Sequence, residues 1–165
     1  MKRIVLTLMF VALYCAATQE TQACTCANVV VDGPTDPAAV EAFNANTKKW
    51  YETRGGALFI GEVLKVEKVK VRAFGLKRPW PFKKVTIRVE KYWVGVQSPE
   101  IIIYTGVDDA GCGVPYVKGT RYLFKAHNLD GRLQTSICTH KQIGDPITAW
   151  YDKVFGEARE FEPRR

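Results

Sequence analysis

Cysteine is the residue type through which this sequence can do the most chemistry. The 165-residue chain contains Cys15, Cys24, Cys26, Cys112 and Cys138. Thiolates form disulfides, exchange electrons or bind soft metals. A Cys-X-Cys pair followed far downstream by two more cysteines, in a chain that begins with an export signal, indicates disulfide stapling rather than a redox pair. We therefore take Cys24-Thr25-Cys26 as the stretch around which the rest of the chain is organised.

The first 23 residues follow the pattern of a secretory signal. A basic start, Lys2-Arg3, leads into an apolar run over residues 4–17 and then a short polar stretch that ends at Ala23. The run is shorter than the roughly 20 residues that a membrane span needs. The pattern predicts an exported protein, extracellular or periplasmic, whose mature chain has no transmembrane segment.

Two cleavage sites fit this signal. Cleavage after Ala23 leaves Cys24 as the first mature residue, and cleavage after Ala17 leaves Thr18. We predict the Cys24 start. A lipid-modified Cys24 is less favoured, because Thr21 occupies a position where such signals usually carry an aliphatic residue.

The predicted mature chain, residues 24–165, has the size of one domain. Removal of Lys2, Arg3 and Glu20 leaves 22 basic and 16 acidic residues, a net charge of +6. Four cysteines remain, which implies two disulfides with three possible pairings. A direct bond from Cys24 to Cys26 would close a strained ring. We therefore expect each of them to reach Cys112 or Cys138.

The elements that must position these cysteines are mostly strands. From Ala57 the side chains alternate between two faces with a period of two residues, which predicts a long strand with a possible bend at Gly61. This alternation continues in segments 83–93, 100–105, 122–126 and 132–137, with turns at 72–81 and 129–131. Five short antiparallel strands predict an all-β domain with flanking helices: a five-stranded Greek-key barrel of the OB type, stapled by disulfides.

Two helices are predicted beside this barrel. Asp36 can cap a helix that has Pro37 at its first position and stops at Gly55-Gly56. The spacing of Val40, Phe43, Thr47, Trp50 and Tyr51 places them on one face. We expect that face to pack over the end of the sheet, and a partner-binding helix is the alternative. A second helix is predicted over residues 146–160.

Catalytic residue sets are not apparent in this sequence. His127 and His140 lie on separate predicted elements and match no metal-ligand spacing. Asp108-Asp109 lacks the further spaced oxygen ligands that a calcium site needs, so we interpret the pair as solvated loop residues. No nucleophile elbow, phosphate loop or dinucleotide fingerprint occurs. We predict a protein that is not an enzyme and that has no cofactor or metal of its own.

The first predicted hairpin is strongly basic. Between residues 65 and 91 lie Lys65, Lys68, Lys70, Arg72, Lys77, Arg78, Lys83, Lys84, Arg88 and Lys91, opposed by Glu67 and Glu90. Phe74, Trp80 and Phe82 are interleaved with them. Such a surface can bind single-stranded nucleic acid, but we expect no nucleic-acid partner for an exported protein.

A polyanionic surface or acidic glycan is the more plausible ligand of this hairpin. The predicted binding residues are Lys68, Lys70, Arg72, Lys77, Arg78, Lys83 and Lys84. The alternative is a solvated hairpin whose charges protect a sheet edge from pairing.

The cysteine framework and several short motifs resemble the netrin-like domain, in particular its branch similar to tissue inhibitors of metalloproteinases. The motifs are CTC at 24–26, FIGEV at 59–63, VEKYWVG at 89–95, YTG at 104–106, CGVPY at 112–116 and TSIC at 135–138. The resemblance runs over almost the whole predicted mature chain. It implies an OB barrel, the disulfides Cys24–Cys112 and Cys26–Cys138, and inhibition of zinc proteases.

The inhibition that the resemblance implies has a clear chemical basis. A catalytic zinc holds three protein ligands and leaves one position for water. The amino group and carbonyl of an N-terminal Cys24 can displace that water as a chelate, because a terminal amine with a pKa near 8 loses its proton at small cost. Thr25 would enter the specificity pocket of the protease. The alternative is a non-inhibitory binding module that holds a polyanion or envelope component.

Overall fold

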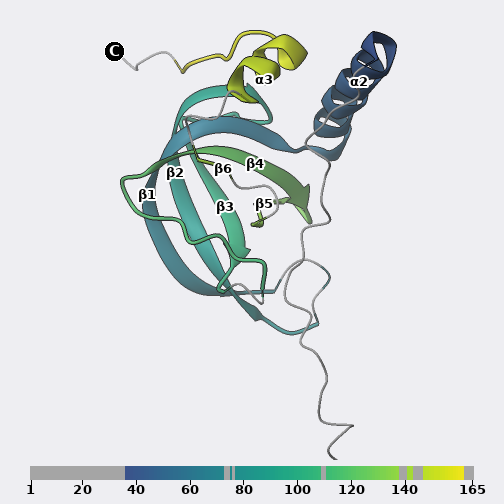
Figure 1. The fold of residues 1–165 in the computed structure, drawn as a ribbon. Coiled ribbons are helices and arrows are strands. Elements are labelled where there is room, and N and C mark those ends of the chain that lie inside the picture. Colours follow the sequence, from purple (N-terminus) through teal and green to yellow (C-terminus); the bar gives the residue numbers. More distant parts are fainter. Residues whose placement is uncertain are drawn as a thin grey trace, which may run out of the picture.

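The protein is described here from a computed structural model that covers residues 36–72, 75, 77–108, 111–137, 141–142 and 147–161. The elements are α2 (Pro37–Arg54), β1 (Ala57–Val71), β2 (Trp80–Val94), β3 (Glu100–Gly106), β4 (Arg121–Leu129), β5 (Arg132–Gln134), β6 (Lys141–Gln142) and α3 (Ile147–Phe155) (Figure 1). The expectation of a mostly β protein with two helices is confirmed. Cys24, Thr25, Cys26 and Cys138 lie outside the described residues.

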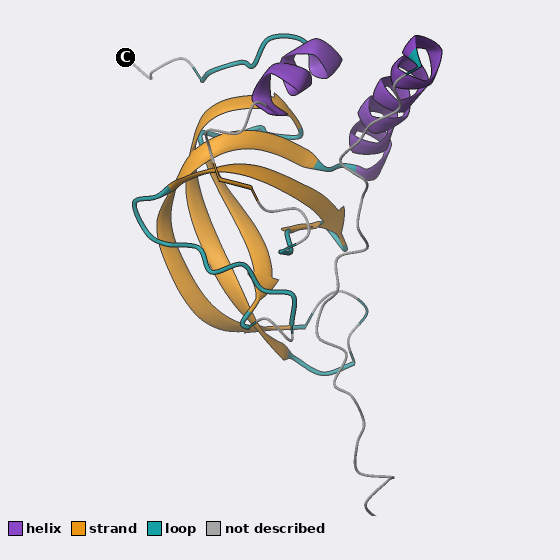
Figure 2. Ribbon diagram, viewed as in Figure 1, coloured by secondary structure: helices purple, strands orange, loops and turns teal. Residues whose placement is uncertain are grey.

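The strands form a mixed sheet that closes into a ring. The pairing order is β1-β2-β3-β5-β4, and β4 pairs again with β1 (Figure 2). The prediction that all strands are antiparallel is wrong for one pair: β3 and β5 are parallel, and the other pairs are antiparallel. A short strand that the sequence did not predict, β6, adds to β4 beside this ring.

Strands β1 and β2 make a long hairpin whose register shifts three times, between Leu58 and Phe59, Ile60 and Gly61, and Val63 and Lys65. The second shift lies where the sequence predicted a bend. A Cβ atom on Gly61 would lie 2.5 Å from the carbonyl oxygen of Arg88, so only glycine fits at this point of the strand pairing. The third shift changes which face of β1 points inward, and Val66 consequently packs against the core inside the ring.

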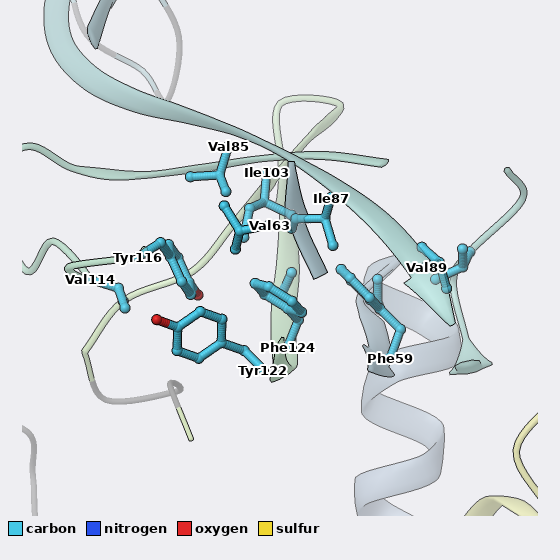
Figure 3. Close-up of a cluster of buried hydrophobic side chains, with 13 residues drawn as sticks. Phe59, Val63, Val85, Ile87, Val89, Ile103, Val114, Tyr116, Tyr122 and Phe124 are labelled. Carbon is cyan, nitrogen blue, oxygen red and sulfur yellow. The ribbon is translucent and has the colours of Figure 1, made fainter. Parts of the chain in front are cut away.

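The main core fills the inside of the ring. Phe59 stacks on Phe124 with 4.9 Å between ring centroids, and Tyr116 and Tyr122 lie next to Phe124 (Figure 3). Aliphatic side chains of β1, β2 and β3 complete the cluster: Val63, Val85, Ile87, Val89 and Ile103. Burial of these side chains from water is the main force that holds the ring together.

A second cluster lies on the outside of the sheet, under the helices. Leu58, Ile60, Trp93 and Leu123 form it together with one tyrosine from each helix, Tyr51 of α2 and Tyr151 of α3. The indole Nε1 of Trp93 donates a hydrogen bond of 2.8 Å to Asp152 Oδ1 of α3. The start of β1 is therefore buried on both faces.

Helix α2 begins and ends as predicted but packs differently. Asp36 Oδ2 accepts a hydrogen bond from the backbone N–H of Ala39, and Gly55 ends the helix with φ of 62°. The predicted apolar face is buried only at Tyr51, since Phe43 is 46% and Trp50 43% exposed. The helix stands away from the sheet and meets it at the end that leads into β1 (Figure 1).

The C-terminal helix is shorter than the predicted span of residues 146–160. Helix α3 ends at Phe155, and Gly156 follows with φ of 88°. The chain then runs extended along β2, where Tyr92 and Arg159 exchange two backbone hydrogen bonds of 2.8 Å. This pairing with a strand edge, which the local pattern does not contain, ends the helix early. In the described part of the chain, neither helix is long and apolar enough to cross a membrane.

Candidate functional site

The glycine-rich loop after β3 holds Cys112 in a defined position. A Cβ atom on Gly106 would lie 1.9 Å from the carbonyl oxygen of Gly111, so the two backbone segments touch. Asp108 fastens the loop, because its carbonyl accepts the N–H of Gly113 at 2.7 Å and its Oδ1 accepts that of Gly111 at 2.9 Å. Cys112 itself adopts φ of 55°, a value unusual for a residue other than glycine.

Asp108 was interpreted as a solvated loop residue, and its side chain is exposed. Its hydrogen bonds to the loop backbone were not foreseen. Asp–x–x–Gly spacing is a signal for such a turn, because an aspartate side chain often bonds backbone N–H groups a few residues on. The neighbouring Asp109 lies outside the described residues.

Two segments that carry predicted disulfide cysteines meet at the end of β3. The backbone N–H of Ile137, the residue before Cys138, donates a hydrogen bond of 3.1 Å to the carbonyl oxygen of Cys112. The N–H of Thr135 similarly reaches the carbonyl oxygen of Tyr104 at 2.9 Å. Cys112 is disulfide-bonded. The other four cysteines fall outside the described residues, so the predicted pairings and the zinc-chelating role of Cys24 stay predictions.

Buried polar groups hold the chain between Cys112 and β4 against the end of the ring. The N–H of Val114 donates to Thr105 Oγ1 at 3.0 Å, and the hydroxyl of Tyr116 donates to Thr135 Oγ1 at 3.4 Å. Tyr122 accepts the N–H of Val117 through its hydroxyl at 3.2 Å. Burial raises the pKa of the Tyr116 hydroxyl, so this group stays neutral and keeps its proton to donate.

Toward the end of the hairpin that is nearest the helices, basic side chains form ion pairs with glutamates. Lys65 lies 2.8 Å from Glu67, Lys91 lies 3.3 Å from Glu160, and Arg88 contacts Glu62. On β4, Arg121 contacts Glu90 of β2 in the same way. The hydrogen bond from Lys65 lowers the pKa of Glu67, and the charges of Lys65 and Lys84 add to this effect. This half of the hairpin is therefore close to neutral.

The outer half of the hairpin carries the residues of the predicted polyanion site, which we call the cationic end: Lys68, Lys70, Arg72, Lys77, Arg78, Lys83 and Lys84. None of them forms an ion pair with another described residue. Lys68 and Lys83 are direct cross-strand partners, an unfavourable arrangement for like charges. Lys83 Nζ also lies 3.5 Å from the carbonyl oxygen of Val114, so the cationic end borders the Cys112 loop.

The sheet divides the cationic end between its two faces. Lys68, Lys70 and Lys83 continue the face that carries Val66 and Val85, where the core inside the ring ends. Lys84 lies on the other face, opposite Glu67. Of the interleaved aromatic residues, Phe82 is buried, Trp80 is 59% exposed, and Phe74 lies outside the described residues.

The other residues considered for chemistry do not form a site in the described chain. His127 is half-buried on β4, and burial lowers its pKa. His140 lies outside the described residues. Within the described ranges, no three His, Cys, Asp or Glu side chains are close enough together to hold a metal ion.

Sequence reasoning missed one shallow groove, of about 370 Å³, between the two helices and the end of β2. Its lining includes Lys48, Trp93, Phe155 and Arg159. The guanidinium of Arg159 lies 4.7 Å from the Tyr92 ring centroid and donates to the Trp93 carbonyl oxygen at 3.0 Å. These contacts fasten the C-terminal segment to β2 and give Arg159 a structural role.

Comparison with known proteins adds no family to this description. A scan against protein-family models and a search of curated proteins both found no match.

Proposed function

We propose that this protein is an exported inhibitor of zinc metalloproteases that binds the protease zinc through the amino group and carbonyl of Cys24. One observation carries the proposal: the carbonyl of Cys112 is hydrogen-bonded to the residue that precedes Cys138. This contact supports two neighbouring attachment points for the Cys24-Thr25-Cys26 stretch, at Cys112 and at Cys138. Thr25, between the two cysteines, would enter the specificity pocket.

The spacing of the two segments suits a double attachment. In an extended chain, the Cα atoms of residues i and i+2 are about 6.5 to 7 Å apart. The Cα atoms of facing residues in two adjacent hydrogen-bonded segments are about 5 Å apart. A disulfide joins Cα atoms that are about 4.4 to 6.8 Å apart. Cys24 can therefore pair with Cys112 while Cys26 pairs with Cys138, as the family resemblance implies.

Rigidity is what makes such a terminus an effective inhibitor. The loop that holds Cys112 is fixed by its contact between Gly106 and Gly111 and by the hydrogen bonds of Asp108. A chelating group that is already ordered loses little conformational entropy when it binds. The closure of the ring in the order β1-β2-β3-β5-β4 supports the further proposal of a disulfide-stapled OB barrel.

The proposal is tested with the exported protein and one variant with an additional alanine before Cys24. The extension replaces the free amine by an amide, which cannot chelate zinc, so we expect inhibition of a sensitive zinc protease to weaken by about 1,000-fold, the effect of losing a central contact worth ~4 kcal/mol. A matched control has the same alanine after Arg165 and should inhibit like the unmodified protein. Equal inhibition by both extended proteins would show that Cys24 does not chelate zinc.

Two mass measurements complete this test. The intact mass should correspond to an unmodified chain that starts at Cys24, and a start at Thr18 or a lipid on Cys24 would contradict the proposal. Peptide mapping without reduction should give Cys24–Cys112 and Cys26–Cys138. A Cys112–Cys138 bond would leave the N-terminus untied, which also contradicts it.

A further inference from the structure

Most of the positive charge of the hairpin lies away from its ion-paired half, although two carboxylates are near the cationic end: Glu67 lies opposite Lys84, and Asp130 Oδ2 accepts the N–H of Gly75 at 3.0 Å. Lys65, Arg88 and Lys91, which lie nearer the helices, each have a glutamate partner. The cationic end has no ion pair among the described residues, and Lys68 faces Lys83 directly across the strands. Folding alone gains nothing from this arrangement, since like charges placed opposite one another destabilise a sheet. An external anion would relieve the repulsion.

A large aromatic side chain is exposed at the same place. Trp80 starts β2 opposite Val71 and is 59% exposed, more than Phe43 or Trp50 on α2. Arg72 adjoins Val71, and Arg78 lies two residues before Trp80, so cations flank the indole along both strands. Tryptophan next to arginine and lysine is the combination found where proteins meet the headgroup region of a bilayer.

We propose that the cationic end and Trp80 dock the protein on an anionic lipid bilayer. The turn of the hairpin would face the bilayer, because Lys68 and Lys70 lie on one face of the sheet and Lys84 and Trp80 on the other. These lysines, together with Arg72, Lys77 and Arg78 near the turn, would contact lipid phosphates, and the Trp80 indole would lie among the headgroups. The exposed indole favours a bilayer over a soluble acidic glycan, because tryptophan has an apolar body and a polar N–H that suit the boundary between lipid and water. This inference does not depend on zinc chelation by Cys24.

The first test measures binding of the exported, oxidised protein to vesicles of phosphatidylglycerol and phosphatidylcholine by co-sedimentation. We expect binding to anionic vesicles at low salt, and little to vesicles of phosphatidylcholine alone. Because each basic residue near an anionic surface strengthens binding about fivefold, Lys68→Gln with Lys70→Gln should weaken it about 25-fold. The matched control, Arg88→Gln with Lys91→Gln, removes the same charge from paired positions on the hairpin and should weaken binding less than about threefold.

The second test locates the contact by fluorescence. Brominated lipids quench tryptophan that lies among the headgroups and upper acyl chains. We expect quenching for the unmodified protein and for Trp50→Phe, and loss of quenching for Trp80→Phe. A circular-dichroism melt of each variant identifies any that fails to fold, and both Trp substitutions are at exposed positions where such failure is not expected.

Three outcomes would overturn the inference. One is equal binding to neutral and anionic vesicles. Another is equal weakening by the two double variants, which would show that net charge alone attracts the protein. The third is binding to a sulfated polysaccharide without binding to anionic vesicles, which would assign the cationic end to a glycan instead.

Discussion

At the scale of single residues, close approach of two backbone segments explains why glycine stands at positions 61 and 106. Gly61 of β1 lies at a register shift against β2, and an added Cβ would be 2.5 Å from the carbonyl oxygen of Arg88 and 2.6 Å from Ile87 Cγ2. Gly106 is similarly pressed against Gly111. The sequence predicted a bend at Gly61 because glycine interrupts an alternating strand, but the partner across that bend depends on the register of β2.

We predict that Gly61→Ala lowers the free energy of unfolding by about 1 to 3 kcal/mol, because the methyl group must displace a backbone carbonyl in the sheet. Urea denaturation of the oxidised protein measures the change. Gly111→Ala is the comparison, since the atom nearest to its Cβ would be Asp108 Oδ1 at 3.3 Å, and the nearest backbone atoms, of Asp108 and Gly106, would lie at an ordinary contact distance of 3.6 Å. A loss at Gly61 no larger than that at Gly111 would show that the strands can separate there without cost.

At the scale of elements, the two helices are attached to the sheet by a few aromatic side chains. Tyr51 of α2 packs edge-on against Phe155 of α3, with 5.6 Å between ring centroids, and both lie over the outer cluster around Trp93. Burial raises the pKa of Tyr51 to about 12, so its hydroxyl is neutral at physiological pH. Phe43, two turns earlier, lies beside Trp150 of α3, with 6.0 Å between ring centroids.

We expect Tyr51→Ala to destabilise the protein by about 3 kcal/mol, as loss of a buried aromatic side chain usually does. Phe43→Ala should cost about 1 kcal/mol or less, because nearly half of that side chain already faces solvent. Thermal unfolding followed by circular dichroism compares the two variants. Similar losses would mean that α2 packs along its whole length rather than at its final turn.

At the scale of the whole molecule, the ring brings the start of the β3–β4 connection and the segment after β5 to one place. Cys112, Ile137 and the cationic end all lie toward the end of the ring where β3 finishes, whereas the helices lie at the start of β1 (Figure 1). The Cys112 loop and the proposed membrane surface are therefore neighbours, while the helices and the shallow groove lie apart from both.

A cross-link at that end should stabilise the whole fold. We predict that Cys112→Ser lowers the free energy of unfolding by about 2 to 5 kcal/mol, since removal of a disulfide frees the unfolded chain. Urea denaturation with and without reductant provides the measurement, and reductant should affect the Cys112→Ser protein less than the unmodified one. A variant as stable as the unmodified protein would contradict a structural role for this bridge.

The sequence by itself determined the elements: the helix with its cap at Asp36, the alternation that begins at Ala57, and the glycine-rich loop that carries Cys112. These depend on residues close together in the chain, whose periodicity and turn chemistry are local. Only the tertiary structure decided that Val66 turns inward, that α3 stops at Phe155, and that Lys68 faces Lys83. Each of these depends on strand register, which long-range packing sets and no single stretch of the chain contains.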